Sequence, residues 1–208
     1  MRLWDPATCR PLGKPLTGHS GSVNALAAVP LADGRTLLAS GGHDRTIRLW
    51  DPVIRRPAGR PLTTPTAWVN ALAAVPLADG RTLLASGEVD GVVRLWDAAR
   101  RTSAGSLTIA GGADPVRALA VLPMPGGRTL LAAAGDYDGT VRLWDPATGQ
   151  LVSALAGHAA SVGALAAAPL PDGRVLLVSA GADRAIMVWA LTTDQVAPGQ
   201  QGPLDGFA

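Results

Sequence analysis

The stretch Ile47-Arg48-Leu49-Trp50-Asp51 sets the organisation of this chain, because close copies of it return at a nearly constant interval. The copies occupy residues 93–97, 141–145 and 186–190, and a truncated copy occupies residues 2–5. Their tryptophans stand at positions 4, 50, 96, 144 and 189, so the steps are 46, 46, 48 and 45 residues. A repeat of this length indicates an array or a propeller of small structural units rather than one or two ordinary domains.

Each repeat contains three short apolar runs separated by turn residues. In the first repeat, the pair Asp33-Gly34 lies between two of these runs and is a strong hairpin signal. A shorter run at residues 12–17 contains Gly13 and Pro15, which suit an outer, edge strand. The sequence therefore predicts an all-β unit with one outer strand and three inner strands. The second repeat copies the first so closely that residues 69–87 are identical to residues 23–41.

The composition excludes several classes of protein. Of 208 residues, 48% are hydrophobic, and the net charge is only +2 with the basic residues spread through the repeats, so no nucleic-acid partner is expected. No apolar run is long enough for a membrane helix, and Cys9 is the only cysteine, so no membrane contact or internal disulfide is expected. We therefore expect a cytoplasmic protein. Lys14 is the only lysine beside seventeen arginines, which indicates a GC-rich bacterial genome.

The landmarks of the first unit resemble those of a WD repeat: Gly18-His19, an apolar strand, the Asp-Gly hairpin, Ser40-Gly41, Asp44 and Trp50-Asp51. The resemblance implies a β-propeller of four-stranded antiparallel blades, used as a non-enzymatic platform for protein partners. It also implies that the outer strand beginning each repeat belongs to the preceding blade. We expect residues 1–190 to form four such repeats, at about 18–63, 64–108, 109–155 and 156–190, with residues 191–208 as a loose tail.

In the family that this chain resembles, a histidine, a serine or threonine, an aspartate and the tryptophan form a structural hydrogen-bond network. The two outer units offer complete sets: His19, Ser40, Asp44 and Trp50, and His158, Ser179, Asp183 and Trp189. The two middle units offer partial sets: Ser86, Asp90 and Trp96, with Pro65 in place of the histidine, and Asp138 and Trp144, with Gly112 and Ala134 at the other positions. The second and third units are therefore expected to lack the full network and to have looser loops.

The serine, histidine and aspartate of this network invite a catalytic interpretation as a hydrolase triad. Two observations favour a structural role: the set occurs twice in equivalent places, and each serine lies inside an apolar strand without a Gly-x-Ser-x-Gly elbow. No metal site and no cofactor are expected, because no paired histidines or cysteines stand at ligand spacing. A hydrolase or small-ligand site in the central channel remains the less favoured alternative.

Four units pose a problem of closure, because a half ring would leave apolar faces and sheet edges in water. The chain could close alone as a small ring, join a second copy in an eight-bladed ring, or be part of a longer protein. We favour a homodimer of two half rings, in which the outer strand at residues 12–17 completes the fourth blade of the partner chain. The alternative is a recently amplified repeat fragment of a larger regulatory or sensor protein.

The units differ most around the loops that precede the first strand and the structural aspartate, where the family usually binds partners. The candidate partner-binding residues at these positions are Asn24, His43, Trp68, Asn70, Arg117 and Tyr137. Trp68 is the one tryptophan outside the period, and aromatic and arginine side chains are favoured interface anchors. The competing interpretation is that Trp68 only caps its blade.

Overall fold

The computed structural model describes residues 1–65, 67–108, 114–135 and 137–192, and nearly all of their regular structure is β-strand. The predicted all-β class is therefore confirmed. The helical structure in the described part of the chain is one short 3-10 turn, η1 (Pro125–Gly127). None of the described residues belongs to a helix with the length and apolar character needed to span a bilayer. The predicted tail lies, from residue 193 on, outside the described residues.

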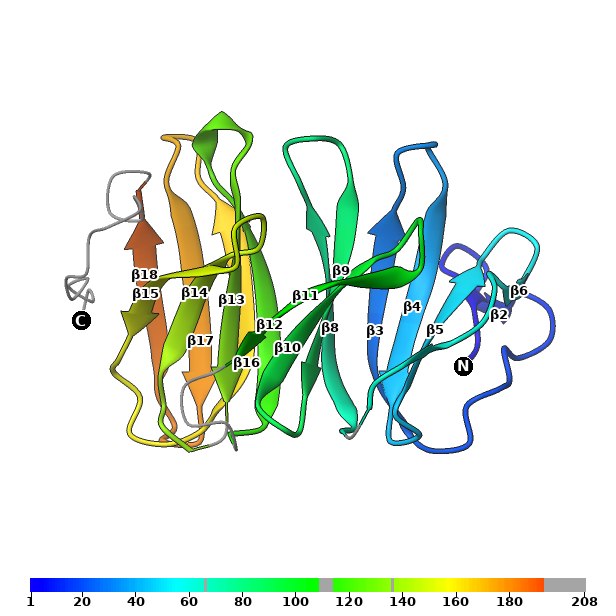
Figure 1. The fold of residues 1–208 in the computed structure, drawn as a ribbon, viewed down its shortest axis with the longest axis horizontal. Helices are drawn as coiled ribbons and strands as arrows, with labels where there is room; N and C mark the ends of the chain where they lie inside the picture. Colours follow the sequence, from blue (N-terminus) through cyan, green and yellow to red (C-terminus); the bar gives the residue numbers. More distant parts are fainter. Residues whose placement is uncertain (66, 109–113, 136, 193–208) are drawn as a thin grey trace.

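The long strands form four antiparallel sheets, here called blades, one for each sequence unit (Figure 1). Blade 1 contains β3 (Val23–Pro30), β4 (Thr36–Gly42), β5 (Thr46–Asp51) and an outer strand in two pieces, β6 (Arg56–Pro57) and β7 (Leu62–Thr63). Blade 2 contains β8 (Val69–Pro76), β9 (Thr82–Glu88), β10 (Val92–Asp97) and β11 (Thr102–Thr108). Blade 3 contains β12 (Val116–Pro123), β13 (Thr129–Gly135), β14 (Val141–Asp145) and β15 (Gln150–Leu155). Blade 4 contains three strands, β16 (Val162–Pro169), β17 (Val175–Gly181) and β18 (Ile186–Leu191).

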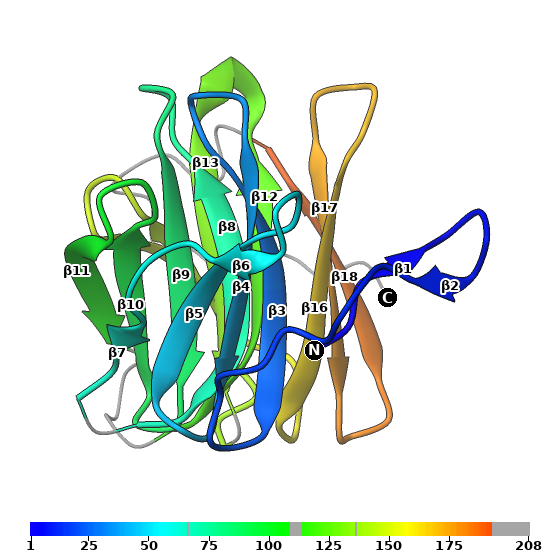
Figure 2. The same ribbon diagram turned by 90° about the vertical axis from the view of Figure 1, so that its right-hand side faces the viewer.

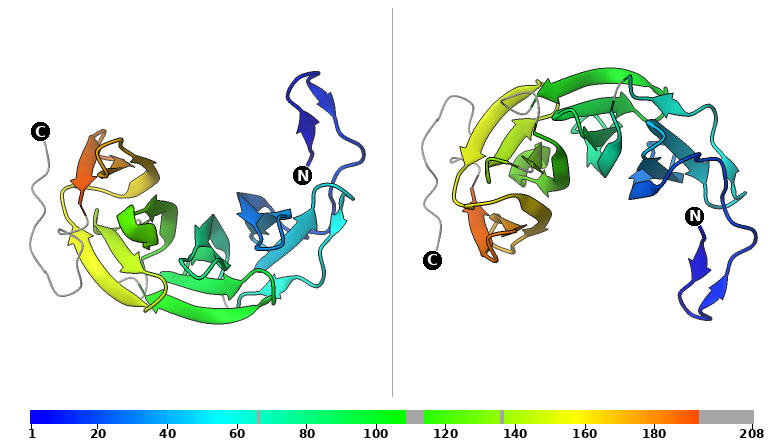
Figure 3. Two further views of the ribbon diagram at one scale, coloured as in Figure 1. Left: turned by 90° about the horizontal axis from the view of Figure 1, so that it is seen from above. Right: turned by 90° about the horizontal axis from the view of Figure 1, so that it is seen from below.

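The blades stand side by side in an open arc rather than in a closed ring (Figure 3). Their first strands line the inside of the arc, where β3 contacts β8, β8 contacts β12 and β12 contacts β16. The outer strands β11 and β15 lie on the convex side (Figure 3). The outer strands that lead into the second, third and fourth repeats belong to the blade before them, as the resemblance implied.

The apolar core lies between neighbouring blades. One cluster joins Val29 and Ile47 of blade 1 to Val69 and Leu84 of blade 2. Equivalent clusters join blade 2 to blade 3 and blade 3 to blade 4. Each blade therefore needs a neighbour on both faces to bury its side chains, which is typical of repeat architectures.

The hairpin between β3 and β4 follows the Asp-Gly signal of the sequence. The Asp33 carboxylate accepts a hydrogen bond from the backbone N–H of Arg35 at 3.0 Å and pairs with the Arg35 guanidinium at 2.7 Å. Gly34 has a φ of 83°, a left-handed conformation that glycine adopts without strain. The predicted hairpin is confirmed, and the second and fourth units repeat its contacts.

A β-bulge lies near the start of each first strand. The register shifts between Val23 and Ala25 in β3, and at the equivalent place in β8, β12 and β16. A bulge changes the direction in which a side chain points. The residues at the four bulges are Asn24, Asn70, Arg117 and Gly163.

The N-terminal residues form a separate hairpin of β1 (Trp4–Asp5) and β2 (Arg10–Pro11), which continues the arc beyond blade 1 (Figures 2 and 3). Leu12 N–H donates to Leu3 O and Leu16 N–H donates to Met1 O, each at 2.8 Å. The prediction for residues 12–17 therefore needs a correction. The regular strand is only two residues long and ends at Pro11, and the segment is not free, because it pairs with the truncated repeat motif of its own chain.

Candidate functional site

The first unit contains the complete network that the sequence predicted. The indole Nε1–H of Trp50 donates to Ser40 Oγ at 2.8 Å, and Ser40 Oγ lies 2.7 Å from His19 Nε2. His19 Nδ1 lies 2.9 Å from Asp44 Oδ2. Because an indole can only donate, the serine hydroxyl is left to donate to Nε2, and Nδ1–H then donates to the carboxylate. The four groups form one directed chain of hydrogen bonds.

Asp44 is the anchor of this chain of hydrogen bonds. It also accepts hydrogen bonds from the backbone N–H of Ser20 and the hydroxyl of Thr46. Burial alone would raise the pKa of the Asp44 carboxyl, but the hydrogen bonds from Thr46, Ser20 and His19 outweigh it and hold this pKa below its ordinary value. Asp44 therefore remains an ionised acceptor that fixes the loop before β3 to the turn after β4.

The fourth unit repeats the arrangement. His158 lies 2.8 Å from Ser179 Oγ and 2.9 Å from Asp183 Oδ2, and Trp189 Nε1–H donates to the same serine at 3.3 Å. Hydrogen bonds from the backbone N–H groups of Ala185 and Ala159, followed by the contact with His158, lower the pKa of Asp183. The predicted residues of both outer units are thus brought together.

The second unit corrects the expectation that its network is incomplete. Glu88, which the sequence analysis did not single out, is fully buried, and its carboxylate accepts a hydrogen bond from Ser86 Oγ at 3.0 Å. Trp96 Nε1–H donates to the same serine at 3.0 Å. Arg94 pairs with Glu88 and also with Asp90, the latter at 3.1 Å. A glutamate on the strand replaces the histidine of the loop.

The residue two positions after the serine distinguishes the network of the second unit from the networks of the outer units. Glu88 is aligned with Gly42 and Gly181 of the outer units. A Cβ on Gly181 would lie 2.5 Å from His158 Nδ1, and a Cβ on Gly42 would lie 2.0 Å from the carbonyl oxygen of Ser22. Two changes in the sequence indicate this replacement. Pro65 stands where the outer units have the histidine, and Glu88 stands where they have a glycine, two residues after the serine.

The third unit is the incomplete one. Ala134 has no hydroxyl, and among the described residues the buried Trp144 Nε1 finds no acceptor. Asp138 accepts hydrogen bonds from the Thr140 N–H and from Arg142. Asp114, another residue that the sequence analysis missed, is buried and accepts from the backbone N–H of Tyr137 at 2.9 Å. Gly112 lies outside the described residues.

The serine, histidine and aspartate have the contacts of a hydrolase triad, but the environment of the serine opposes nucleophilic chemistry. Ser40 and Ser179 are fully buried, and a tryptophan N–H donates to each hydroxyl oxygen. A nucleophile must reach its substrate, whereas these hydroxyl groups are enclosed and each already accepts an indole N–H. The arrangement instead satisfies a buried indole through a polar network.

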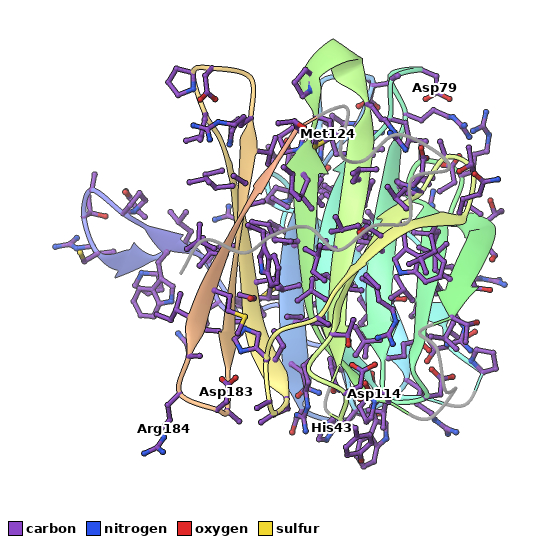
Figure 4. The ribbon with its side chains drawn as sticks, turned by 90° about the vertical axis from the view of Figure 1, so that its left-hand side faces the viewer. His43, Asp79, Asp114, Met124, Asp183 and Arg184 are labelled. Carbon is purple, nitrogen blue, oxygen red and sulfur yellow. The ribbon has the colours of Figure 1, made fainter. Side chains whose placement is uncertain are left out.

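The candidate His43 lies on the lower rim of the arc in Figure 4, where Asp114 and Asp183 are also labelled. Trp68 contacts His43, and Asn24, Asn70 and Arg117 line one hollow together with it. The imidazole of His43 stacks on the indole of Trp68, with ring centroids 4.5 Å apart and an angle of 26° between the planes. Trp68 is 48% exposed and Tyr137 is 74% exposed. Trp68 therefore packs on His43 of the preceding unit, while half of it remains open to solvent.

Four of the candidates line one open hollow of about 540 Å³ on the concave side of this rim: Asn24, His43, Asn70 and Arg117, together with Ser161 and Gly163. The bulges turn the two asparagines toward the next blade, where Asn24 Nδ2–H donates to Val69 O and Asn70 Nδ2–H donates to Val116 O, each at 3.3 Å. Tyr137 is not part of the lining of this hollow.

No group of three or more histidine, cysteine or acidic side chains among the described residues is arranged to hold a metal ion. The polar groups of the hollow are carboxamides, an imidazole, a guanidinium and a hydroxyl. Such groups can donate and accept hydrogen bonds with a peptide backbone or with polar side chains.

The comparison with protein families matches four segments of the chain to one model, described as "WD domain, G-beta repeat". The segments are residues 9–51, 59–97, 105–145 and 149–190, which together make up well over half of the chain. None of the curated proteins matches the chain significantly.

Proposed function

Since the chain belongs to the WD-domain, G-beta repeat family, we propose that it is a non-catalytic scaffold that binds a protein partner at the lower rim. Repeats of this family generally mediate protein–protein interactions, and their propellers are typically non-catalytic. The half-exposed Trp68, stacked on His43 beside the polar hollow, is the observation that carries the proposal.

The chemistry of the rim supports a short protein segment as the ligand. Trp68 offers a flat apolar surface whose orientation is already fixed by stacking, so little conformational entropy is lost on binding. Arg117 and the two asparagines offer hydrogen-bonding groups within the adjacent hollow. An aromatic anchor beside a few polar groups is typical of interface hot spots.

We further propose that a second copy of the chain completes the arc. On the open face of blade 1, Val23 is 39% exposed and Leu26 is 58% exposed. At the other end, Ile186 of blade 4 is 72% exposed. The equivalents of Val23 and Ile186 inside the arc, Val69 and Ile47, are completely buried. Apolar faces of this kind favour association, and a two-fold axis would cover both ends at once.

The scaffold proposal is tested by capturing partners from the native proteome with the purified protein and with Trp68→Ala and Arg117→Ala variants. Both variants are expected to lose the captured protein by at least about tenfold, as for removal of an interface anchor. Ile54→Ser is the matched control, because Ile54 is 62% exposed and lines a different hollow, with Asp33 and Arg101. Equal capture by all four proteins would contradict the proposed surface.

A further inference from the structure

The N-terminal hairpin reproduces the outer half of a blade. Leu16 lies opposite Met1, and the two residues exchange backbone hydrogen bonds of 2.8 and 3.0 Å. In blade 1, Leu62 lies opposite Ile47 in the same way. Trp4 pairs with Pro11, just as Trp50 pairs with Pro57. Residues 10–17 therefore have the sequence and the register of an outer strand.

In the part of the chain that the structure describes, blade 4 has no such strand. Among the described residues, β16 to β18 are its only strands, and nothing pairs with the outer edge of β18. The first residue of β18, Ile186, is aligned with Ile47, Val93 and Val141, each of which is at most 1% exposed. The exposure of Ile186 is the consequence of the missing outer strand and of the missing neighbour.

Residues 10–17 thus have two equivalent third strands to pair with: residues 1–5 of their own chain, or residues 186–190 of another copy. In the first pairing the described sheet contains two strands, β1 and β2, and Trp4 is 56% exposed. The second is backed by β16 and β17, and Ile186 and Val188 of β18 are 72% and 38% exposed, so they offer apolar surface to cover. Residues 10–17 keep the same register in both pairings, so the apolar surface that each pairing covers distinguishes the two.

The inner strands offer a weaker joint between copies. Inside the arc, a Cβ on Gly41 or on Gly87 would lie 2.5 Å from Cγ1 of Val69 or Val116 on the next blade, so glycine permits the close approach. Blade 4 has Ala180 at the aligned position, and at its bulge Gly163 stands where Asn24 and Asn70 bridge to the next blade. The methyl group of Ala180 therefore keeps Val23 of another copy farther from blade 4 than Val69 is from Gly41 inside the arc.

From these observations we infer that two copies are joined through their outer strands: residues 10–17 of each copy leave their own residues 1–5 and pair with β18 of the other copy. Leu16 then lies opposite Ile186, Leu12 donates to the carbonyl of Val188, and Pro11 lies opposite Trp189. The wider inner joint, at Ala180 and Val23, is a secondary contact. This inference rests on the proposed joining of two copies.

Two single-cysteine proteins test the register directly. Leu16→Cys and Ile186→Cys are made separately in a Cys9→Ser background, mixed, oxidised mildly and analysed by mass spectrometry for the peptide pair that a disulfide links. The positive control is a single chain with Ile47→Cys and Leu62→Cys, which places two cysteines in the register already present in blade 1. The mass of the unmodified protein in solution is measured in parallel.

We expect a mass of two chains and a disulfide between positions 16 and 186 in the mixture, at a yield within about twofold of the control, because the two pairings have the same geometry. A mass of two chains without this disulfide, while the control forms, would overturn the strand exchange and leave the joining of two copies intact. A mass of one chain would overturn both.

Discussion

Residues 23–41 of the first unit and residues 69–87 of the second are identical in sequence but differ in environment. Val23 is 39% exposed, whereas Val69 is completely buried against blade 1. The strands themselves are the same, with the same register and the same bulge. The difference shows that burial in this fold is a property of the joint between two blades and not of the strand sequence.

The same two segments also differ in chemistry. Ser40 and Ser86 are identical in position and both accept a hydrogen bond from a tryptophan, but the first contacts His19 and the second contacts Glu88. Both partners lie just outside the identical stretch. The polar network is therefore specified by a few residues in the loops and at the ends of the strands.

Replacement of Ser40 by alanine is expected to have the largest effect. It leaves Trp50 Nε1 and His19 Nε2 without a partner in a buried site, which costs about 2–3 kcal/mol of the free energy of unfolding. Ser86→Ala is expected to cost only about 1 kcal/mol, because Glu88 keeps its pair with Arg94. Urea unfolding measures both, with the exposed Ser22→Ala as the control; equal losses at the two serines would contradict the distinction.

Alanine at Gly41 is expected to cost about 2 kcal/mol, since its Cβ would overlap Val69 of the next blade. Adding Val69→Ala should recover part of the loss, because it removes the methyl group in contact.

At the open end, Ala180→Gly removes a methyl group and should tighten the association of two copies, which concentration-dependent light scattering measures. An additive double variant, or unchanged association of Ala180→Gly, would break the comparison between interior joints and ends.

The matched pair Val69→Ala and Val23→Ala makes one chemical change in identical sequence. Val69→Ala is expected to cost about 1.5 kcal/mol of unfolding free energy through lost burial and a cavity. For Val23→Ala the expected cost at low protein concentration is below about 0.5 kcal/mol, because the side chain is already partly in water. Thermal unfolding of both variants measures the difference, and equal costs would contradict an open first face.

Glu88 makes the stability of the second unit depend on pH. Burial raises the pKa of its carboxyl to about 7, from an ordinary value of 4.5, although Arg94 and Ser86 oppose the shift. Between these values the folded chain binds more protons than the unfolded chain, so this group makes stability fall as pH rises through that window. Glu88→Gln is expected to flatten this dependence by on the order of 1 kcal/mol in unfolding experiments from pH 4.5 to 7. A wild-type stability that rises through the window in parallel with the variant would refute this role.

The sequence was sufficient for the repeat, the all-β class and the network of the outer units, because the period of Trp50 and the Gly18-His19 and Asp33-Gly34 signals are local. It was not sufficient for Glu88 or Asp114. Glu88, at the end of β9, is buried beside Ser86 and Arg94, and Asp114 is buried against the backbone of Tyr137. A single acidic residue carries no local signal of such burial. The pairing of residues 12–16 with Met1 and Leu3 was missed for a related reason, since an outer strand can pair equally with any copy of the third strand.

The most direct measurement is the mass of the protein in solution by light scattering, over a range of concentrations. One chain has a mass of 21.1 kDa. If two half arcs cover each other's open faces, the measured mass is twice this value. The two copies are then expected to dissociate when Val23 and Leu26 are both replaced by serine. A mass of one chain at all concentrations would contradict the joining of two copies and show that the open faces of blades 1 and 4 remain in water.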